Sequence, residues 1–355
     1  MSLLINEHVP LASLTTINLG GPAAYFAECT TTGEVCEALE FAASRRLKIH
    51  ILGGGSNTIF LDEGFPGLIL KMGIRHVQTE QDGDAVIFTA GGGVVWDDCV
   101  LDAVNMGASG IECLSGIPGT VGASPIQNIG AYGQEVKDTV ESVSVVDRQT
   151  LRPGVFSGAE CRFAYRQSRF KGADRGRYVI TEVRYRLRKN ASPEIKYPEL
   201  QKFLTVQTDV QRPEDHSSIL QSIRKAVLML RYSKSMVFDI SDENTRSVGS
   251  FFMNPVLSVE KVEALKTRVA ELGKTMPNVF PSPEGVKVPA AWLIEQSGFQ
   301  KGYTKNGAAI SSRHALALVN RGCRTVDILN LAAEIQAGVF SVFGVELERE
   351  GIVID

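Results

Sequence analysis

Three consecutive glycines at residues 53–55 are the first residues whose type and spacing suggest a binding function. They follow an apolar, strand-like run at residues 48–52 and precede Ser56 and Asn57. Because glycine has no Cβ atom, its backbone reaches conformations that let several N–H groups converge on one phosphate-like anion. The two polar side chains would add hydrogen bonds to the same ligand. On local sequence alone, a tight structural turn explains this glycine run equally well.

A second segment, residues 110–133, is rich in glycine, proline and other small residues. It contains Gly-Ile-Pro-Gly-Thr-Val-Gly at 116–122 and Gln-Asn-Ile-Gly-Ala-Tyr-Gly at 127–133. Glycine and proline at this density disfavour both helix and strand, so the backbone groups are available to a flat or phosphorylated ligand. The alternative is a long surface loop, although loops of this length without a function are uncommon. Apolar Ile117 and Val121 indicate that the segment is packed.

Helices and strands with clear periodicity surround these glycine-rich segments. A helix with Thr32 as its N-cap is expected before the first glycine run, ending at Arg45 and Arg46. A strand at residues 86–90 leads into a second triple glycine at 91–93 and then into a helix that begins at Trp96. The triple-glycine pattern therefore occurs twice.

In the second half of the chain, a polar stretch at residues 208–218 precedes an amphipathic helix, and we place the main domain boundary there. Another helix is expected after its N-cap Ser258, and a last one after Thr325. Earlier, residues 177–188 alternate in the manner of a strand with one buried and one solvated face. Because repeated parallel βαβ units are not evident, a mixed α+β fold is favoured.

Composition excludes several classes of function. The chain has 355 residues, 44% hydrophobic and 22% charged, with a formal net charge of -3. No basic field favours a nucleic-acid partner. The six cysteines form no Cys-x-x-Cys pair and no zinc-like cluster with histidine, so we expect reduced thiols and no metal site. No signal-peptide pattern and no run of about 18 apolar residues is evident, so a cytoplasmic protein without membrane association is expected.

Six motifs in order resemble those of the UDP-N-acetylenolpyruvoylglucosamine reductase family, also called UDP-N-acetylmuramate dehydrogenase. They lie at residues 53–57, 116–122, 127–133, 161–171, 249–255 and 343–348. The resemblance extends from about residue 15 to residue 350. Six motifs in the family's order make chance similarity very improbable.

The resemblance implies an α+β protein with a two-part FAD-binding domain of the vanillyl-alcohol-oxidase (PCMH) type and a C-terminal α+β substrate-binding domain. The implied divisions are 1–73 and 74–218 for the two FAD-binding subdomains, 219–342 for the substrate-binding domain, and 343–355 for a segment that returns to the FAD domain. FAD would bind without a covalent link, and NADPH would supply hydride. The residues implied to bind the cofactor are Gly53, Gly54, Gly55, Ser56, Asn57, Ser115, Gly116, Ile117, Pro118, Gly119, Gly122, Ser124, Gln127, Asn128, Gly130, Ala131 and Tyr132.

The implied reaction reduces the enolpyruvyl ether of UDP-N-acetylglucosamine enolpyruvate to the lactyl ether of UDP-N-acetylmuramate, a peptidoglycan precursor. Such a site needs fixed cations or donors at the substrate carboxylate and an acid at the carbon that takes up the proton. Arg166 and Glu348 match the family residues that stabilise the enolate-like intermediate, and Ser250 matches the proton donor. Without the resemblance, Arg166 would be read as a salt-bridged surface residue and Ser250 as part of a turn.

The resemblance also implies four substrate-binding residues. Tyr197 matches a tyrosine on a loop that closes over the sugar nucleotide in one form of the family. Lys234 and Asn254 match positions that hold the diphosphate or neighbouring groups, and a lysine cation suits a diphosphate. His314 matches a polar residue on the substrate side, although a structural histidine explains it equally well. A monomer is expected.

Two features depart from the commonest family pattern. Arg349 stands where a proline often follows the glutamate, and residues 234–247 are longer than in some members. Both affect the expected loop geometry rather than the chemistry. The Rossmann signature Gly-x-Gly-x-x-Gly is absent from the early glycine runs, which fits a different flavin fold. Two alternatives remain open from the sequence: an FAD-dependent sugar or alcohol oxidase of the same superfamily, and a sugar-nucleotide-binding module without turnover.

Overall fold

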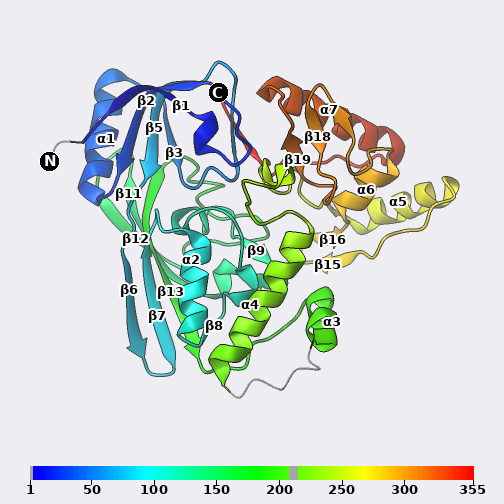
Figure 1. The fold of residues 1–355 in the computed structure, drawn as a ribbon, viewed down its shortest axis with the longest axis horizontal. Helices are drawn as coiled ribbons and strands as arrows, with labels where there is room; N and C mark the ends of the chain where they lie inside the picture. Colours follow the sequence, from blue (N-terminus) through cyan, green and yellow to red (C-terminus); the bar gives the residue numbers. More distant parts are fainter. Residues whose placement is uncertain (1–2, 208–214) are drawn as a thin grey trace. The chain divides into compact units, whose positions relative to one another are not determined.

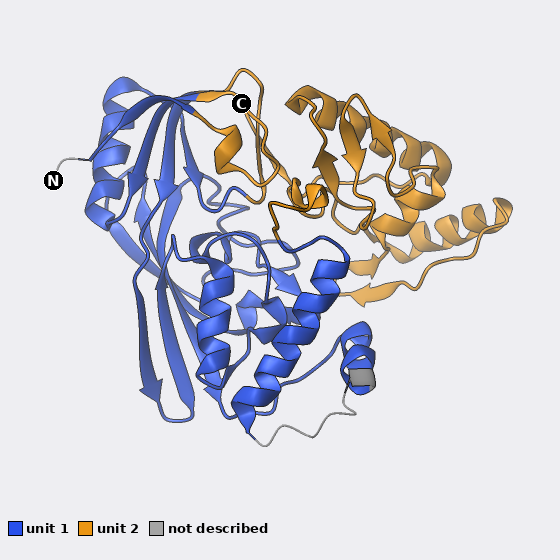
Figure 2. Ribbon diagram, in the orientation of Figure 1, with its two compact units in different colours: residues 1–9, 23–55, 66–237 blue, residues 10–22, 56–65, 238–355 orange. Residues whose placement is uncertain are grey.

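The computed structural model describes residues 3–207 and 215–355, so residues 208–214 of the predicted polar stretch lie outside the described residues. The chain forms two compact units, which Figure 2 shows in different colours. Unit 1 consists of residues 1–9, 23–55 and 66–237, and unit 2 of residues 10–22, 56–65 and 238–355. Two short N-terminal segments are therefore built into the unit that otherwise contains the C-terminal third of the chain.

Unit 1 begins with a four-stranded sheet in the order β1-β2-β5-β3. Its strands are β1 (Asn6–Pro10), β2 (Pro22–Cys29), β3 (Ile49–Leu52) and β5 (Phe65–Met72), and β3 pairs with β5 in parallel. Helix α1 (Thr32–Arg45) joins β2 to β3 and packs Val35, Leu39 and other apolar residues against this sheet. The capping residue of α1 is Thr31, which forms a capping box with Glu34, so the predicted N-cap Thr32 was wrong by one residue.

A larger, six-stranded sheet forms the rest of the unit 1 framework (Figure 1). Its order is β12-β11-β13-β7-β6, with β8 pairing β13. The strands are β6 (Val77–Asp82), β7 (Ala85–Gly91), β8 (Ala108–Ser109), β11 (Val140–Asp147), β12 (Pro153–Ser157) and β13 (Tyr178–Lys189). β13 has the predicted alternation, since Val183, Tyr185 and Leu187 are buried whereas Arg186 and Arg188 are exposed.

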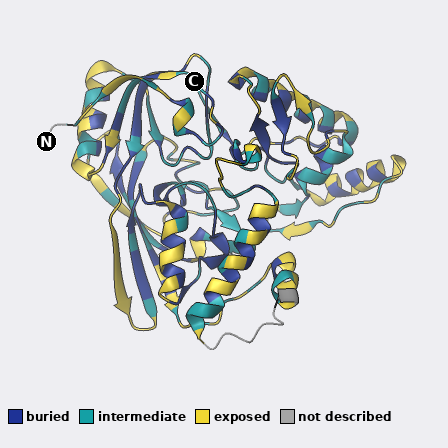
Figure 3. Ribbon diagram, viewed as in Figure 1, coloured by how far each residue is buried: buried dark blue, intermediate teal, exposed yellow. Residues whose placement is uncertain are grey.

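Helices α2 (Trp96–Asn105) and α4 (His216–Ser233) contact each other and share one hydrophobic core with β7 and β13. Both helices are amphipathic, with buried and exposed residues on different sides (Figure 3). Asp215 caps α4 by accepting a hydrogen bond from Ser218 N at 2.9 Å. The last three residues of the predicted polar stretch therefore belong to the helix. Unit 1 is completed by the hairpin of β9 (Gly130–Ala131) with β10 (Gln134–Glu135) and by α3 (Pro198–Gln207).

Unit 2 contains three further helices and three small sheets. The helices are α5 (Val259–Glu271), α6 (Ala290–Gln296) and α7 (Thr325–Phe343). One sheet has the order β14-β16-β15, with β14 (Val256–Leu257), β15 (Phe280–Ser282) and β16 (Gly285–Lys287). Another has the order β17-β18-β19, with β17 (Thr304–Lys305), β18 (Ala308–Ile310) and β19 (Leu318–Asn320). Ser258 caps α5 as predicted, by accepting from Lys261 N.

Specific contacts explain why residues 56–65 belong to unit 2. β4 (Thr58–Phe60) pairs in parallel with the C-terminal strand β20 (Ile352–Ile354). Asp62 Oδ1 accepts a hydrogen bond from Thr325 N at 2.9 Å, at the first residue of α7, and Thr325 Oγ1 donates to Phe60 O at 2.8 Å. A carboxylate is favourable at this place because it satisfies an N–H group that the helix leaves unpaired and interacts with the helix dipole.

The compact units differ from the predicted divisions, since α4 belongs to unit 1 whereas the substrate-binding domain was expected to begin at residue 219. The functional domains stay a prediction. Among the described residues, α7 alone is long and apolar enough to cross a membrane, by length and composition only. Ile328, Ala332, Ile335 and Val339 of α7 lie in the unit 2 core, as expected of a core helix.

We predict that Asp62→Ala destabilises unit 2 by about 1 kcal/mol, because α7 loses its acceptor and its favourable charge. The expected decrease in Tm is roughly 2–4 °C. Glu63→Ala is the matched control, since Glu63 is an exposed neighbouring acid. Thermal unfolding of both variants checks the prediction, and equal Tm values for the two would contradict it.

Candidate functional site

The first triple glycine lies directly against the second glycine-rich segment. A Cβ atom on Gly54 would be 2.7 Å from Gly119 Cα, and one on Gly53 would be 2.7 Å from Thr120 Oγ1. Gly55 has φ +68°, in the left-handed region that favours glycine. Lys71 on β5 donates to Gly53 O. The first triple glycine and residues 119–120 are distant in sequence, but they lie so close together that a side chain on Gly53 or Gly54 would not fit between them.

The second triple glycine packs on the other part of the same segment. A Cβ atom on Gly122 would lie 3.0 Å from both Gly92 Cα and Gly92 O. Gly122 N donates to Gly92 O at 2.9 Å, and Val121 N donates to Val94 O at 2.9 Å. Residues 119–122 are therefore in contact with both triple-glycine runs. The sequence indicated the repeated pattern but gave the second run no role at the site.

Thr120 was not among the predicted cofactor-binding residues, although it lies within the motif. Its side chain is buried, and Oγ1 has no hydrogen-bond partner among the residues that the structure describes. A buried hydroxyl without a partner is unfavourable and calls for an explanation. Because Thr120 lies beside Gly53, its hydroxyl marks the place where the two glycine-rich segments meet.

The backbone at Gly116 is held by a partly buried ion pair. Gly116 has φ +70°, and its N–H donates to Asp97 Oδ1 at 2.6 Å. Arg224 on α4 binds both oxygens of Asp97, at 2.6 and 2.7 Å. Burial raises the pKa of Asp97, but the hydrogen bonds from Arg224 and from Gly116 N outweigh it and lower the pKa below its usual value. The ionised carboxylate thus links α2, α4 and the glycine-rich segment.

Arg231 is a buried cation beside Gly116 that the sequence analysis missed. It is 5% exposed, and its Nη2 donates to Met236 O at 2.8 Å. Nε is buried without a hydrogen-bond partner among the described residues and lies 3.4 Å from where a Cβ of Gly116 would be. Burial lowers the pKa of Arg231 to about 10, opposed by Tyr132 and Asp97. The helical pattern of α4 gave no sign of a buried charge near its end.

Asn128 lies in the left-handed region and uses its side chain within the protein. It is fully buried with φ +47°. Its Nδ2 donates to Glu135 Oε2 at 3.0 Å and to Ala164 O at 2.9 Å, while Oδ1 accepts from Lys137 N at 3.0 Å. The carboxamide therefore holds the glycine-rich segment together and is not available to a ligand.

The hairpin of β9 and β10 has a two-residue turn at Tyr132 and Gly133, with φ +48° and +86°. Positive φ at both central residues is typical of a type I′ turn. Burial raises the pKa of Tyr132 to about 12, so its phenol is neutral and can donate a hydrogen bond.

The hydroxyl groups of two predicted serines have partners within unit 1. Ser124 Oγ lies 2.8 Å from Tyr185 OH, and Ser115 Oγ donates to Glu112 O at 2.6 Å.

The other predicted cofactor residues in this region are half-buried: Ile117, Pro118, Gln127, Gly130 and Ala131. All of them belong to unit 1. The predicted cofactor-binding residues at 53–55 and at 115–132 therefore lie together in unit 1. Ser56 and Asn57, which were also predicted to bind the cofactor, belong to unit 2.

Arg166 is connected to the same region through its guanidinium group. Nη2 donates to Gly130 O at 2.9 Å, and Nη1 donates to Asn128 O at 3.5 Å. The residue has φ +53° and lies in a tight turn in which Ala164 and Gln167 exchange backbone hydrogen bonds. A non-glycine residue in this conformation is uncommon and occurs preferentially at functional sites.

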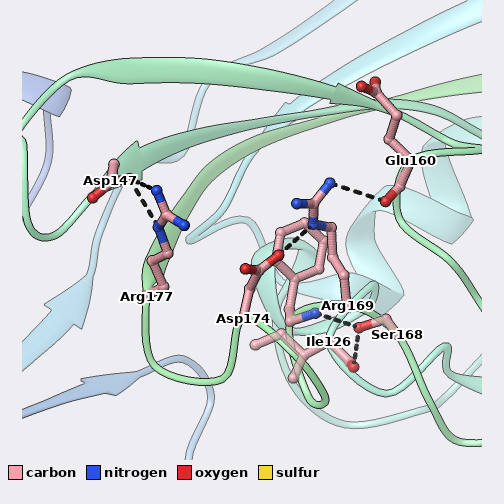
Figure 4. Close-up of polar contacts among 8 residues, drawn as sticks. Ile126, Asp147, Glu160, Ser168, Arg169, Asp174 and Arg177 are labelled. Atoms are coloured by element: carbon pink, nitrogen blue, oxygen red, sulfur yellow. Dashed lines mark hydrogen bonds and ion pairs between the residues drawn. The ribbon is translucent and has the colours of Figure 1, made fainter.

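The segment that carries Arg166 is cross-linked by its own side chains (Figure 4). Arg169 Nε donates to Asp174 Oδ2 at 2.7 Å. Ser168 Oγ donates to Ile126 O at 2.5 Å, which ties the turn to the glycine-rich segment. These contacts restrict the position of Arg166 before any ligand binds.

Ser250 and Glu348 lie in unit 2 on neighbouring segments of the chain. Met253 N donates to Glu348 O at 3.0 Å, and Glu350 N donates to Phe251 O at 2.8 Å. Ser250 is half-buried, and its Oγ is 3.5 Å from His314 Nε2, whereas Glu348 is exposed. Unit 2 therefore brings three of the predicted residues into one region, while Arg166 belongs to unit 1.

Asn57 and Asn254 each support the backbone of unit 2. Asn57 Nδ2 donates to Glu350 O at 3.3 Å, and Asn57 O accepts from Ile352 N at 3.0 Å. Asn254 Oδ1 accepts from Ala290 N at 2.9 Å, at the start of α6. The predicted glycine run thus continues directly into a residue that fixes the segment after Glu348.

Tyr197 and Lys234, both predicted substrate ligands, lie in unit 1 with internal partners. The Tyr197 ring meets the Tyr132 ring edge to face, with centroids 5.4 Å apart and an interplanar angle of 89°. Lys234 Nζ is 3.0 Å from Glu199 Oε1 and 2.9 Å from Oε2. Glu199 was not singled out from the sequence, because an acid in an exposed first helical turn is ordinary.

No group of three or more His, Cys, Asp and Glu side chains among residues 3–207 and 215–355 is placed to hold a metal ion. The six cysteines are free thiols. The predicted absence of a metal stays a prediction.

Comparison with known proteins identifies both parts of the chain. Residues 23–150 match the family described as "FAD binding domain". Residues 241–354 match the family described as "UDP-N-acetylenolpyruvoylglucosamine reductase, C-terminal domain". The predicted α+β fold with a separate C-terminal domain is confirmed.

Curated relatives match over the full length. A UDP-N-acetylenolpyruvoylglucosamine reductase from Thermobifida fusca is 46% identical, with 100% of this chain and 99% of the relative covered. The Streptomyces coelicolor protein of the same name is 44% identical, with 97% and 89% covered. The crystal structure of UDP-N-acetylenolpyruvylglucosamine reductase from Thermus caldophilus has a TM-score of 0.65 at 24% identity, covering 100% of both chains, and shows a similar fold.

We predict that Gly54→Ala lowers the stability of unit 1 by about 1–3 kcal/mol, because the new methyl group would overlap the Gly119 backbone. Gly33→Ala on α1 is the matched control, since its Cβ would meet only Thr31 Oγ1 at 3.8 Å. Chemical denaturation of the two variants gives the comparison. If Gly54→Ala is as stable as Gly33→Ala, the close approach of the two segments is wrong.

Proposed function

The chain belongs to the UDP-N-acetylenolpyruvoylglucosamine reductase family, and we propose on this premise which of its residues bind and act. It is an FAD-dependent oxidoreductase that reduces UDP-N-acetylenolpyruvoylglucosamine with NADPH in peptidoglycan synthesis. The observation that carries this conclusion is 46% identity with a named reductase over the whole chain. The family assignment selects this activity over the sugar or alcohol oxidase and over a module without turnover.

The meeting point of the glycine-rich segments fits the diphosphate of FAD. Gly54 and Gly119 leave no room for side chains between them, so the N–H groups of the two segments lie close enough together to bind one anion. The buried, unpartnered Thr120 hydroxyl supplies a hydrogen bond that nothing in the described protein uses. We assign the holding of FAD to residues 53–57 and 115–132, with Thr120 added to the predicted set.

When bound, FAD would supply hydride transfer from NADPH to the methylene carbon of the substrate. The chain's own residues must supply a proton to the adjacent carbon and stabilise the negative charge that spreads from this carbon onto the carboxylate bonded to it. We assign the proton to Ser250 Oγ. A serine hydroxyl is a weak acid, so a neighbouring donor is required, and His314 Nε2 at 3.5 Å is in position to return a proton to Ser250.

Arg166 and Glu348 complete the proposed catalytic set. The bonds from Arg166 to Gly130 O and Asn128 O hold its guanidinium, so the charge that would face the substrate carboxylate is oriented in advance. Glu348 would stabilise the same intermediate. Tyr197, Lys234 and Asn254 are proposed to bind the sugar nucleotide, with the Lys234 cation directed to its diphosphate.

We further propose that the protein acts as a monomer in the cytoplasm, without a membrane or nucleic-acid partner. Its substrates, NADPH and a nucleotide sugar, are water-soluble anionic metabolites. The net charge of -3 gives no general attraction to nucleic acids.

Thr120→Val tests the cofactor site. Because the hydroxyl has no partner among the described residues, we predict that the apoprotein keeps its stability, whereas FAD dissociates about 10- to 150-fold faster, the effect of losing one hydrogen bond to a charged group. The FAD off-rate, followed by flavin fluorescence, gives the measurement.

Thr181→Val is the matched control, because the buried Thr181 Oγ1 donates to Ser144 O at 3.2 Å. This variant should lose stability and retain FAD. An unchanged FAD off-rate in Thr120→Val would remove Thr120 from the cofactor site.

Ser250→Ala tests the reaction and the proton donor together. We expect NADPH oxidation by the unaltered protein to depend on UDP-N-acetylenolpyruvoylglucosamine, and turnover of Ser250→Ala to fall by about 10²–10⁴-fold, the usual contribution of a general acid. Flavin reduction by NADPH alone should stay unchanged in the variant, because no proton reaches the substrate in that step.

Two outcomes would contradict different parts of the proposal. If the substrate does not stimulate the unaltered protein, the assigned activity is wrong. If the substrate stimulates turnover and Ser250→Ala retains full activity, the activity stands and Ser250 is not the proton donor.

A further inference from the structure

We propose that Glu199 competes with the substrate diphosphate for Lys234 and so limits how tightly phosphate-bearing ligands bind. The inference rests on the proposed role of Lys234 as a diphosphate ligand. A diphosphate that uses the lysine must displace the carboxylate, so Glu199 weakens the binding of ligands that carry this group and does not affect ligands without phosphate.

The Glu199–Lys234 ion pair is well formed. Both carboxylate oxygens lie within 3.0 Å of the same ammonium nitrogen. Glu199 is in the first turn of α3, and Lys234 follows the last residue of α4. Each charge has the sign that the nearby helix end favours. The ammonium is therefore already engaged by an anion of the protein.

The backbone on both sides of Glu199 is fixed, so the carboxylate is a positioned competitor rather than a loose surface group. Leu200 is fully buried in the core that contains α4. Tyr197 packs on Tyr132, and its carbonyl accepts from Gln201 N at 3.0 Å. After a ligand leaves, Glu199 returns to the same place beside Lys234.

A diphosphate and Glu199 cannot share Lys234 without repulsion. Both are anionic, and like charges at contact distance oppose each other. The side chains of Lys234 and Glu199 are 32% and 43% exposed, so the pair is weak enough for a diphosphate to displace. The expected effect of Glu199 is a modest reduction in affinity that applies only to ligands bearing phosphate.

Glu199→Gln in the FAD-loaded protein tests this inference, with UDP and uridine as probes in calorimetry. Removing the competing charge should tighten UDP binding about two- to fivefold at low salt, the typical range for an exposed ion pair. Uridine affinity should not change, because uridine has no phosphate. The gain for UDP should decrease at high salt, where exposed charges are screened.

Glu194→Gln is the matched control, since Glu194 is another exposed acid of the same segment and pairs with Lys196 at 2.9 Å. It should leave UDP affinity unchanged. In turnover, Glu199→Gln should lower KM for the enolpyruvyl substrate by the same factor as the UDP affinity gain, without a decrease in kcat. A purely structural role for Glu199 would change both ligands and both constants.

Lys234→Met separates this inference from the proposed function. If it weakens UDP binding and Glu199→Gln added to it gives no further gain, the competition is supported. If Lys234→Met weakens UDP binding but Glu199→Gln alone has no effect or weakens it, only the competition is wrong. If Lys234→Met leaves UDP affinity unchanged, the role of Lys234 fails, and the inference fails with it.

Discussion

The site in unit 1 depends on the close approach of backbone segments at residues where a Cβ atom has no room. Gly54 meets Gly119, and Gly92 meets Gly122, so a segment of four residues touches both triple-glycine runs. Side chains would separate these segments, and the backbone N–H groups that a diphosphate needs would then be spread too far apart to act together. The strands that precede the two glycine runs belong to the two sheets of unit 1, so these sheets bring the glycine-rich segments together.

Charged side chains around Gly116 also hold the second glycine-rich segment in place. The Asp97 carboxylate accepts from Gly116 N and is bound by Arg224, and this pairing offsets the cost of removing the partly buried charge from water. Arg231 lies next to the same glycine, and its Nε has no partner among the residues that the structure describes. A cation in this environment contributes positive potential to the proposed cofactor region, and burial strengthens that potential because water no longer screens it.

Local sequence signals predicted the elements whose determinants are local. Capping residues and helical periodicity were sufficient to predict α1 and α5, and alternation was sufficient to predict β13. The predicted N-cap of α1 was wrong by one residue, since the cap is Thr31 rather than the residue after it. The membership of residues 56–65 in unit 2 depends on the pairing of β4 with β20, almost 300 residues away. The proposed catalytic residues came from the family resemblance, because nothing in their local pattern distinguishes Arg166 or Ser250 from ordinary residues. Thr120 and Arg231 became visible only because each has a buried polar atom without a partner among the described residues.

Asn128, Tyr132 and Arg166 are among the non-glycine residues of unit 1 that have a left-handed backbone conformation. Each is unfavourable in isolation, and the surrounding contacts hold them in place: the Asn128 carboxamide makes three hydrogen bonds, and Arg166 binds the carbonyls of Asn128 and Gly130. Because Arg166 binds the carbonyl of Asn128, these two conformations support each other through contacts within the protein chain. The backbone and the Arg166 cation are then ordered before ligands bind, so binding energy is not spent on ordering them and remains available to stabilise charge during the reaction.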